Sequence, residues 1–314
     1  MIRTNISKVV FIWIALMLVA ALLGDVSVAA SDVGRTSADF LQIGVGARAA
    51  GMGGAYTAIS EGAIASYWNP AGLAGLQGTE ISFGHFSWYQ DITVEQGNFA
   101  FALNDRMTMG ASVTYVNYGT VEGYDASGAA TGDLTVYDMT GGLSMGYQVS
   151  DAFSIGVTGK YITQKLDEYS ASAFAADLGV KYRFSRVTLA AAVTNVGSKM
   201  TFDQEAENLP GAVRFGVAVR PFDAPVETSL DFEQRFYGDF LLRQGIELGF
   251  GDQYHLRTGY NYLPSQDGRS AATSIAVGAG VSFDFADFDY AYTPDDKATA
   301  EDLHRFSIVF HLGQ

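Results

Sequence analysis

A serine framed by two glycines is the first candidate for chemistry in this sequence. Residues 142–146 read GLSMG and match the G-x-S-x-G string in which hydrolases hold a nucleophilic serine, here Ser144. That motif needs a turn from a strand into a helix, whereas Ser144 lies in a stretch of alternating apolar and polar residues. We therefore interpret the match as a coincidence. A lipase in which Ser144 meets a histidine across strands stays open as an alternative.

The spacing of histidines, cysteines and glycines predicts no metal site and no cofactor. The chain has no Cys, which excludes disulfides, thiolate zinc sites and iron–sulfur clusters. Gly44, Gly46 and Gly51 do not keep the G-x-G-x-x-G spacing of a dinucleotide site. The four histidines do not have zinc spacing either: His85, His255, His304 and His311. We expect no catalytic residue.

The charged residues predict neither a strong cation site nor a nucleic-acid partner. Acidic side chains gather in two expected loops and could hold a divalent cation weakly: Asp203, Glu205, Glu207, Asp295, Asp296, Glu301 and Asp302. Such clusters are more often solvated surfaces, so no metal is predicted. With 19 Lys plus Arg against 34 Asp plus Glu, the net charge is −15. A nucleic-acid partner held through its phosphates is therefore not expected.

The first 30 residues have the order of a secretory signal peptide. Arg3 and Lys8 precede an apolar run, Val9 to Leu23, and small residues follow up to Ala30. The run of 15 residues is shorter than the ~20 that a membrane-spanning helix needs. We predict cleavage after Ala29 or Ala30 and export from the cytoplasm. An uncleaved anchor is the alternative.

From Thr79 to the end of the chain, apolar and polar residues alternate with the period of strands. Of the 314 residues, 13% are aromatic, 36 are Gly and 6 are Pro, a mixture that suits many strands with tight turns. About fourteen segments follow the pattern. When the connections between strands are numbered along the chain, the long polar ones are all odd-numbered and the tight turns are even-numbered. The long connections are 119–133, 196–210, 263–271 and 294–302. This regularity is typical of an outer-membrane barrel.

The alternation also predicts which side chains face lipid. A fourteen-stranded lumen is too wide for side chains alone to fill, so the apolar face must point outward and the barrel must close. The lipid-facing set for testing is Phe153, Ile155, Val157, Leu178, Val180, Phe215 and Val217. Arg at Val217 should impair assembly more than Arg at Ala218. The alternative fold is a secreted sandwich or a propeller.

Two further sets follow from the same pattern. Six cations fall on the lumen-facing phase, where they could line a polar path, grip a plug, or simply avoid lipid: Lys160, Lys181, Arg183, Arg214, Arg220 and Arg257. Eight tyrosines near segment ends fit the aromatic girdles of a membrane barrel: Tyr115, Tyr118, Tyr137, Tyr161, Tyr260, Tyr262, Tyr290 and Tyr292.

Residues 31–78 differ in texture from the strands that follow. They are rich in Gly and Ala, which pack closely, and we predict a compact plug inside the lumen of a barrel formed by 79–314. A short helix is expected within Ala47 to Ser60, and Asn69-Pro70 should stop any helix. A disordered tail is less consistent with the aromatic residues present here.

Two stretches of this segment carry a family resemblance. Residues 40–56, FLQIGVGARAAGMGGAY, and 67–74, YWNPAGLA, resemble the N-terminal segment of the PorV/PorQ family of FadL-like outer-membrane barrels. The resemblance implies an all-β, fourteen-stranded antiparallel transmembrane barrel with a plug that carries Asn69, Pro70 and Ala71. The chain's final segment, HRFSIVFHLGQ, alternates like a closing barrel strand, although its last residue is Gln314 rather than an aromatic.

The resemblance leaves two functions open. FadL-like relatives pass hydrophobic molecules such as fatty acids or aromatics across the outer membrane, which implies passive transport and a hydrophobic small-molecule ligand. PorV serves type IX secretion as an outer-membrane carrier for protein substrates, which implies secretion-system proteins as partners. In both cases the barrel would sit among outer-membrane lipid.

Overall fold

The computed structural model describes residues 36–88, 91–202, 205–221, 225–251, 253–263, 272–294 and 302–313. The predicted signal peptide, residues 1–30, lies outside the described residues, as do Asp203, Asp295, Asp296 and Glu301 of the acidic loops. In the described part of the chain, no helix is both long and apolar enough to cross a membrane.

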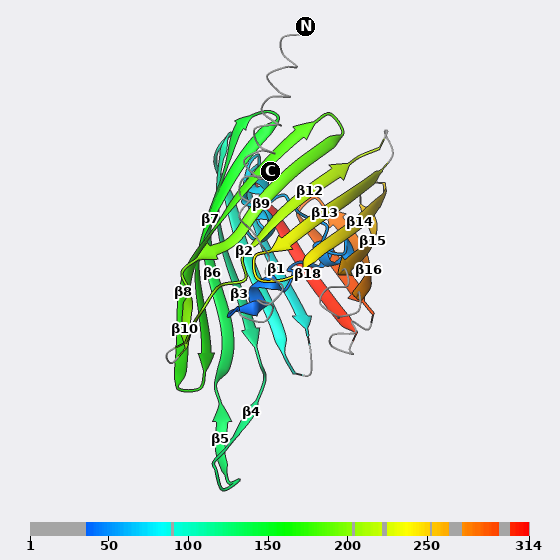
Figure 1. Cartoon of the computed structure of the whole chain (residues 1–314). Coiled ribbons are helices and arrows are strands. Elements are labelled where there is room, and N and C mark those ends of the chain that lie inside the picture. Colours follow the sequence, from blue (N-terminus) through cyan, green and yellow to red (C-terminus); the bar gives the residue numbers. More distant parts are fainter. Residues whose placement is uncertain are drawn as a thin grey trace.

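Fourteen strands form a closed antiparallel barrel in which sequence neighbours pair and the first strand pairs with the last (Figure 1). The predicted fold class is confirmed. The strands are β1 (Thr79–Ser87), β2 (Thr93–Asn104), β3 (Met107–Asn117), β6 (Val136–Ser150), β7 (Phe153–Leu166), β8 (Tyr169–Phe184), β9 (Val187–Gly197), β12 (Ala212–Val219), β13 (Val226–Arg235), β14 (Phe240–Phe250), β15 (Tyr254–Leu263), β16 (Ala272–Phe283), β17 (Ala286–Thr293) and β18 (Leu303–Leu312).

The two ends of the barrel differ. Tight turns such as 105–106, 151–152 and 185–186 lie at one end, here named the turn end. The opposite loop end carries two small hairpins, β4 (Val121–Tyr124) with β5 (Ala130–Leu134), and β10 (Met200–Phe202) with β11 (Glu205–Glu207). The β4–β5 hairpin projects beyond the barrel rim (Figure 1).

The outer face of the barrel is apolar, as predicted. Leu178, Ile155 and Val157 of the lipid-facing set are exposed, and Leu143 on β6 is the most exposed large apolar side chain at 73%. Phe153, Val180, Phe215 and Val217 are half-buried among their neighbours. The residues between them point inward, as shown by Thr158 at 0% exposure and Asp177 at 0%. Hydrocarbon is the environment that accepts the outer rows without a free-energy cost.

Aromatic rings cluster on the outer face near both rims. Toward the loop end, Tyr115 packs on Tyr137 with ring centroids 5.6 Å apart, and Tyr290 packs on Phe306 at 5.1 Å. Toward the turn end, Phe250, Tyr254, Phe283 and Phe285 are exposed. The prediction that Tyr118 belongs to the outer girdle is wrong. Its hydroxyl donates to Asp138 Oδ2 at 2.7 Å inside the barrel, because β3 has ended at Asn117 and the chain turns inward there.

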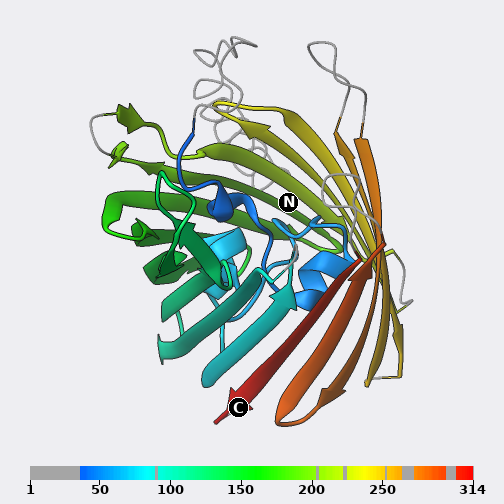
Figure 2. The same cartoon turned by 90° about the horizontal axis from the view of Figure 1, so that it is seen from below.

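Residues 36–78 lie inside the barrel, where the N-terminal segment occupies the centre of the ring (Figure 2). The segment contains η2 (Asp39–Gln42), α2 (Ala47–Gly51), α3 (Ala65–Trp68) and η3 (Pro70–Leu73). The expected helix over Ala47 to Ser60 ends already at Gly51, because Gly53 and Gly54 take positive φ values of 64° and 79°. A Cβ at Gly53 would lie 2.6 Å from the backbone N of Tyr260, so glycine permits close approach to the wall.

Apolar side chains fill the space between the plug and the inner wall. One cluster joins Phe40 and Leu41 of the plug to Val94, Val116 and Ile162 of the strands. Another joins Met52, Tyr56 and Trp68 to Ala190 and Ala218. These contacts agree with the predicted close packing of the Gly- and Ala-rich segment inside the barrel. Ala218 does point inward, but it is 2% exposed against the plug, so Arg at this position would clash rather than serve as a neutral control.

Candidate functional site: the plug seat and the vestibule above it

The Asn-Pro-Ala element seats the plug against strands β7 and β8. Asn69 is fully buried, its Nδ2 donates to the carbonyl oxygens of Thr57 at 3.1 Å and Val180 at 3.2 Å, and its Oδ1 accepts from the Ala71 amide at 3.1 Å. Asn69 thereby caps η3, which begins at Pro70. The wall meets this element with glycine: a Cβ at Gly179 would lie 2.0 Å from Asn69 Oδ1.

A carboxylate from the wall holds the plug backbone. Asp231 on β13 is 1% exposed, and its Oδ2 accepts from the amides of Tyr56 at 2.9 Å and Thr57 at 2.7 Å. These two amides would otherwise lie buried without an acceptor. Burial raises the pKa of the Tyr56 phenol to about 12, against the opposing charge of Arg48, so this ring is a neutral packing element.

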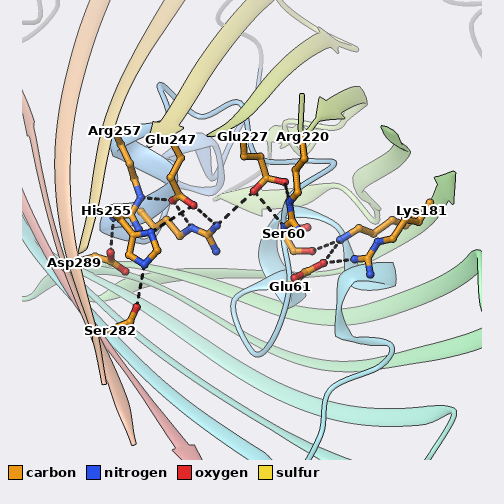
Figure 3. Close-up of polar contacts among 12 residues, drawn as sticks. Ser60, Glu61, Lys181, Arg220, Glu227, Glu247, His255, Arg257, Ser282 and Asp289 are labelled. Atoms are coloured by element: carbon orange, nitrogen blue, oxygen red, sulfur yellow. Dashed lines mark hydrogen bonds and ion pairs between the residues drawn. The ribbon is translucent and has the colours of Figure 1, made fainter. Parts of the chain in front are cut away.

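Helix α2 is fastened by a network of ion pairs (Figure 3). Arg48 donates from Nε and Nη2 to the two oxygens of Glu247, at 2.9 Å each, and its Nη2 lies 3.8 Å from Glu227 Oε2. Arg257 donates to the same Glu247 at 2.5 Å and to Asp289 at 2.5 Å, as Figure 3 shows. Two guanidiniums and three carboxylates are thus paired between the plug and the wall, where low polarity strengthens each contact.

A second ion cluster holds the chain after the Thr57 turn. Lys181 Nζ donates to the Ser60 carbonyl at 3.0 Å and to Glu61 at 3.2 Å, and Arg183 donates to Glu61 at 2.5 Å. Burial alone would raise the pKa of the Glu61 carboxyl, but the charges of Lys181 and Arg183 outweigh it and hold that pKa below its usual value. Lys181 and Arg183, predicted on the lumen side, therefore both contact the plug.

The remaining predicted cations also pair with carboxylates. Lys160 pairs with Asp177 at 2.6 Å and donates to Asn195 at 2.8 Å, and it lies 5.9 Å from the centre of the Tyr67 ring. Arg220 pairs with Glu227 at 2.9 Å, with its side chain 62% exposed at the turn end. Arg214 donates to Glu233 at 2.7 Å and lies over the rings of Tyr67 and Trp68. Arg220 is therefore linked to the α2 network through Glu227, which also lies 3.8 Å from Arg48 Nη2. Lys160 and Arg214 pair with other carboxylates, so the six cations do not line one path.

A cavity of about 620 Å³ lies between the plug and strands β12 to β18, toward the loop end. We call it the vestibule. On the plug side it is lined by Ala50, Gly53, Gly54, Tyr67 and Trp68. On the wall side its charged and polar lining includes Arg214, Arg235, Asp239, Arg243, Asn261, Ser274 and Arg305. Its volume is within the range of small-molecule sites.

Several of these residues escaped the sequence interpretation. Asp231, Glu233 and Glu247 lie on inward phases of strands β13 and β14, as the cations do. Their signal was present, because a carboxylate in the middle of a membrane strand must face inward. Arg48 gave no such signal, since its partner is about 200 residues away along the chain.

The motifs that suggested chemistry are structural in this fold. Ser144 lies within β6, buried, with its hydroxyl 2.8 Å from that of Thr158, so the strand-to-helix turn of a hydrolase is not present around it. Each histidine contacts a polar neighbour on the barrel wall: His85 contacts Glu95, His255 contacts Ser282, His304 contacts Tyr290, and His311 contacts Asp287. Within the ranges that the structure describes, no group of three His, Asp or Glu side chains is placed to hold a metal ion.

Comparison with solved structures finds the same fold in membrane channels. The toluene transporter TodX of Pseudomonas putida superposes with a TM-score of 0.66 at 13% identity, over 86% of this chain and 99% of that one. The monoaromatic hydrocarbon channel CymD gives 0.63 at 14% identity, over 87% and 98%. A FadL homologue of Pseudomonas aeruginosa gives 0.58 at 12% identity, over 86% and 98%. At such identities the likeness establishes the fold alone.

The sequence comparisons point to one family. No curated protein matches the chain significantly. Residues 26–233, two thirds of the chain, match the model of the family described as Type IX secretion system protein PorV. The match covers the plug and the barrel up to β13, including the stretches whose resemblance was noted in the sequence. The chain therefore belongs to the PorV family, and its barrel has the fold of the FadL homologue and of the hydrocarbon channels.

Proposed function

We propose that this barrel passes small hydrophobic or amphipathic compounds across the outer membrane by diffusion, with no bond made or broken. The observation that carries the proposal is the vestibule, a cavity lined in part by a plug that belongs to the same chain. A barrel that binds and passes no compound would have no need of a cavity of about 620 Å³ with Trp68 and Tyr67 on its plug side. The structural neighbours named as hydrocarbon and toluene channels support this choice.

The plug decides how such a compound would proceed. Gly53 and Gly54 form part of the vestibule lining and lie against β14 and β15, so at these two positions a layer of plug backbone without side chains faces the vestibule. A compound that reaches this layer must wait for the plug to shift or for the wall to open beside it. The polar fastenings of Arg48, Asp231 and Asn69 set the frequency of such a shift, because each leaves a buried group unpaired when it breaks.

Uptake into liposomes tests this function. Purified barrel is reconstituted, and entry of radiolabelled ethylbenzene and of short alkylbenzenes is compared with protein-free liposomes. We expect faster entry with the barrel. The matching measurement in cells compares a deletion strain with the parent, and equal uptake by both strains would contradict the proposal.

The compartment and the segment limits belong to the same proposal. We propose that residues 1–30 are a cleaved signal peptide, 31–78 the plug, and 79–314 the barrel. N-terminal sequencing of the protein extracted from outer-membrane fractions should begin at Ala30 or Ser31. A first residue of Met1 in that fraction would show an uncleaved anchor.

A second candidate function rests on the family match. The PorV family is described by its part in type IX secretion, which favours binding of exported proteins. The hairpin β4–β5, which projects from the loop end, is the surface that such a partner would meet first. Co-purification of exported proteins with the full chain, lost when residues 121–134 are replaced by a short turn, would favour this function over transport.

A further inference from the structure

We infer that a groove on the outer wall of the barrel binds one membrane lipid whose headgroup carries a primary amine. The inference concerns the lipid-facing surface and does not depend on the proposed transport through the vestibule. Three features carry it. The groove lies in the lipid-facing wall, its shape fits a flexible chain rather than a second barrel, and a carboxylate lies at its rim.

The groove crosses the seam where β1 pairs with β18, and strands β1 to β3 and β16 to β18 line it. Its volume is about 770 Å³, and Phe83, Phe288 and Phe306 project into it as exposed side chains. Ser307, next to Phe306, points the other way, because its hydroxyl accepts from the plug amide of Ala47 at 3.1 Å. The groove therefore opens toward lipid and not into the lumen.

Small residues make the wall hollow at this place. Gly97 on β2 and Ala279 on β16 take outward positions, and both line the groove. A Cβ at Gly97 would lie 3.4 Å from Cγ1 of Val113, which is itself an exposed outward side chain. On the inner side, a Cβ at Gly51 of α2 would lie 3.2 Å from the Cα of Gly278. The wall thus rests closely on the plug helix, and the short side chains outside leave room for a ligand.

The position and shape of the groove select an acyl chain as its occupant. The side chains that point into it are apolar except at the loop-end rim, so ordered water would find few hydrogen-bond partners there. A two-fold dimer through this face would set groove against groove and leave a void, whose lining lacks contacts. A flexible acyl chain can follow the concave wall and gains the van der Waals contacts that a void loses.

The rim of the groove supplies a carboxylate for the headgroup. Glu95 and His85 point outward from neighbouring strands, both half-exposed, with Glu95 Oε1 2.6 Å from His85 Nδ1. They lie at the level of the loop-end girdle, since Glu95 is opposite Tyr115 and His85 is opposite Phe306. Charge is tolerated at this level, near the headgroups, and is costly at the midplane. A primary ammonium group would complement the Glu95 carboxylate through a charge-assisted hydrogen bond.

Native mass spectrometry of the purified protein measures lipid binding. The probes are phosphatidylethanolamine, phosphatidylcholine and phosphatidylglycerol with identical dioleoyl chains, so that only the headgroup differs. The fraction of the barrel that retains one lipid, followed over lipid concentration, gives each Kd. We expect phosphatidylethanolamine to bind at least tenfold more tightly than the anionic phosphatidylglycerol. Phosphatidylcholine keeps a positive charge but has no N–H donor, so its affinity should fall between them.

Substitutions then locate the lipid. Gly97→Leu fills the groove from an outward position and should weaken phosphatidylethanolamine binding at least tenfold. Gly159→Leu is the matched control and should change binding less than twofold. Gly159 lies on β7 away from the groove, outward and opposite Leu143, and no described atom lies within 4 Å of its Cβ position. Glu95→Gln keeps the size of the side chain and removes its charge, so the preference for phosphatidylethanolamine over phosphatidylglycerol should fall below twofold.

Three outcomes would overturn the inference. Equal affinity for the three lipids, or a preference that Glu95→Gln leaves unchanged, removes the role of the amine. Lipid binding that Gly97→Leu leaves unchanged places the lipid elsewhere on the wall. Retention of a second copy or of another protein, lost in Gly97→Leu, gives the groove a protein as its occupant. Entry of ethylbenzene into liposomes is a separate measurement, so failure of transport and failure of lipid binding are distinguishable.

Discussion

Arg48 of the plug and Glu247 of strand β14 face each other in a two-point ion pair, Nε to Oε2 and Nη2 to Oε1, both at 2.9 Å. The pair joins positions about 200 residues apart and fixes helix α2 to the wall. The geometry matches the planar fork of a guanidinium to the two oxygens of a carboxylate. Arg257 and Asp289 extend the pair, so the plug is held from one side of the barrel by a connected set of charges.

Loss of Arg48 should loosen the plug. In Arg48→Met, Glu247 keeps Arg257 but loses its plug partner, and the free energy of local opening should fall by about 2 kcal/mol, roughly a thirtyfold increase in opening. Hydrogen exchange of the amides from Ala47 to Met52 measures this directly. Arg106→Met is the control, because Arg106 is exposed in the tight turn between β2 and β3 and should leave the exchange of α2 unchanged. Unchanged exchange in Arg48→Met would mean that apolar packing alone holds α2.

A methyl group at Gly179 should displace the Asn-Pro-Ala element. Its Cβ would lie 2.0 Å from Asn69 Oδ1 and 2.9 Å from Pro70 Cδ, so the plug must shift at a cost of roughly 1–3 kcal/mol. We expect Gly179→Ala to lower the unfolding temperature and to raise dye leakage from liposomes. Gly159→Ala on β7 is the matched control, since no atom lies within 4 Å of its Cβ. Identical leakage from both variants would show that the seat tolerates displacement.

Arginine on the outer wall should cost far more than arginine in the vestibule. Val277 in the middle of β16 is 46% exposed on the outer face, whereas Ser274 on the same strand lines the cavity. Val277→Arg should destabilise the barrel by roughly 2–4 kcal/mol in lipid, and Ser274→Arg by much less. Urea unfolding in lipid vesicles compares the two. The comparison of Val277 with Ser274 replaces the comparison of Val217 with Ala218, because Ala218 packs on the plug and has no room for an arginine. Equal destabilisation would refute the outward facing of the apolar rows.

The Glu61 cluster should lose its contribution in acid. The folded-state pKa of Glu61 lies below its ordinary value of 4.5, so the stabilisation is present above that value and is lost as the pH falls through the folded pKa. The difference in unfolding temperature between wild type and Glu61→Gln should be constant above pH 5 and should shrink below pH 4.5. Thermal unfolding at intervals from pH 3 to 7 measures it. A difference that grows on acidification would contradict the predicted direction.

Much of the barrel could be predicted from local patterns. Alternation with period two identified the fourteen wall strands, because each side chain of a strand must choose between lipid and lumen. The same rule predicted that the side chains of Lys181 and Arg214 point into the barrel. Gly and Ala in residues 31–78 indicated close packing, and the Asn69-Pro70 pair ended α3 as expected.

The arrangement of the plug required the tertiary structure. Alternation states that Lys181 faces inward, but not that it meets Ser60 and Glu61, because that meeting depends on how the plug turns at Gly53 and Gly54. It treats Ala218 and Ser274 alike, although one packs against the plug and the other lines a cavity. Sequence alone thus determined the direction of each wall side chain, since lipid acts on every residue locally. Closure of the barrel around its own N-terminal segment decided which inward groups pair, because those pairs join positions far apart in the chain.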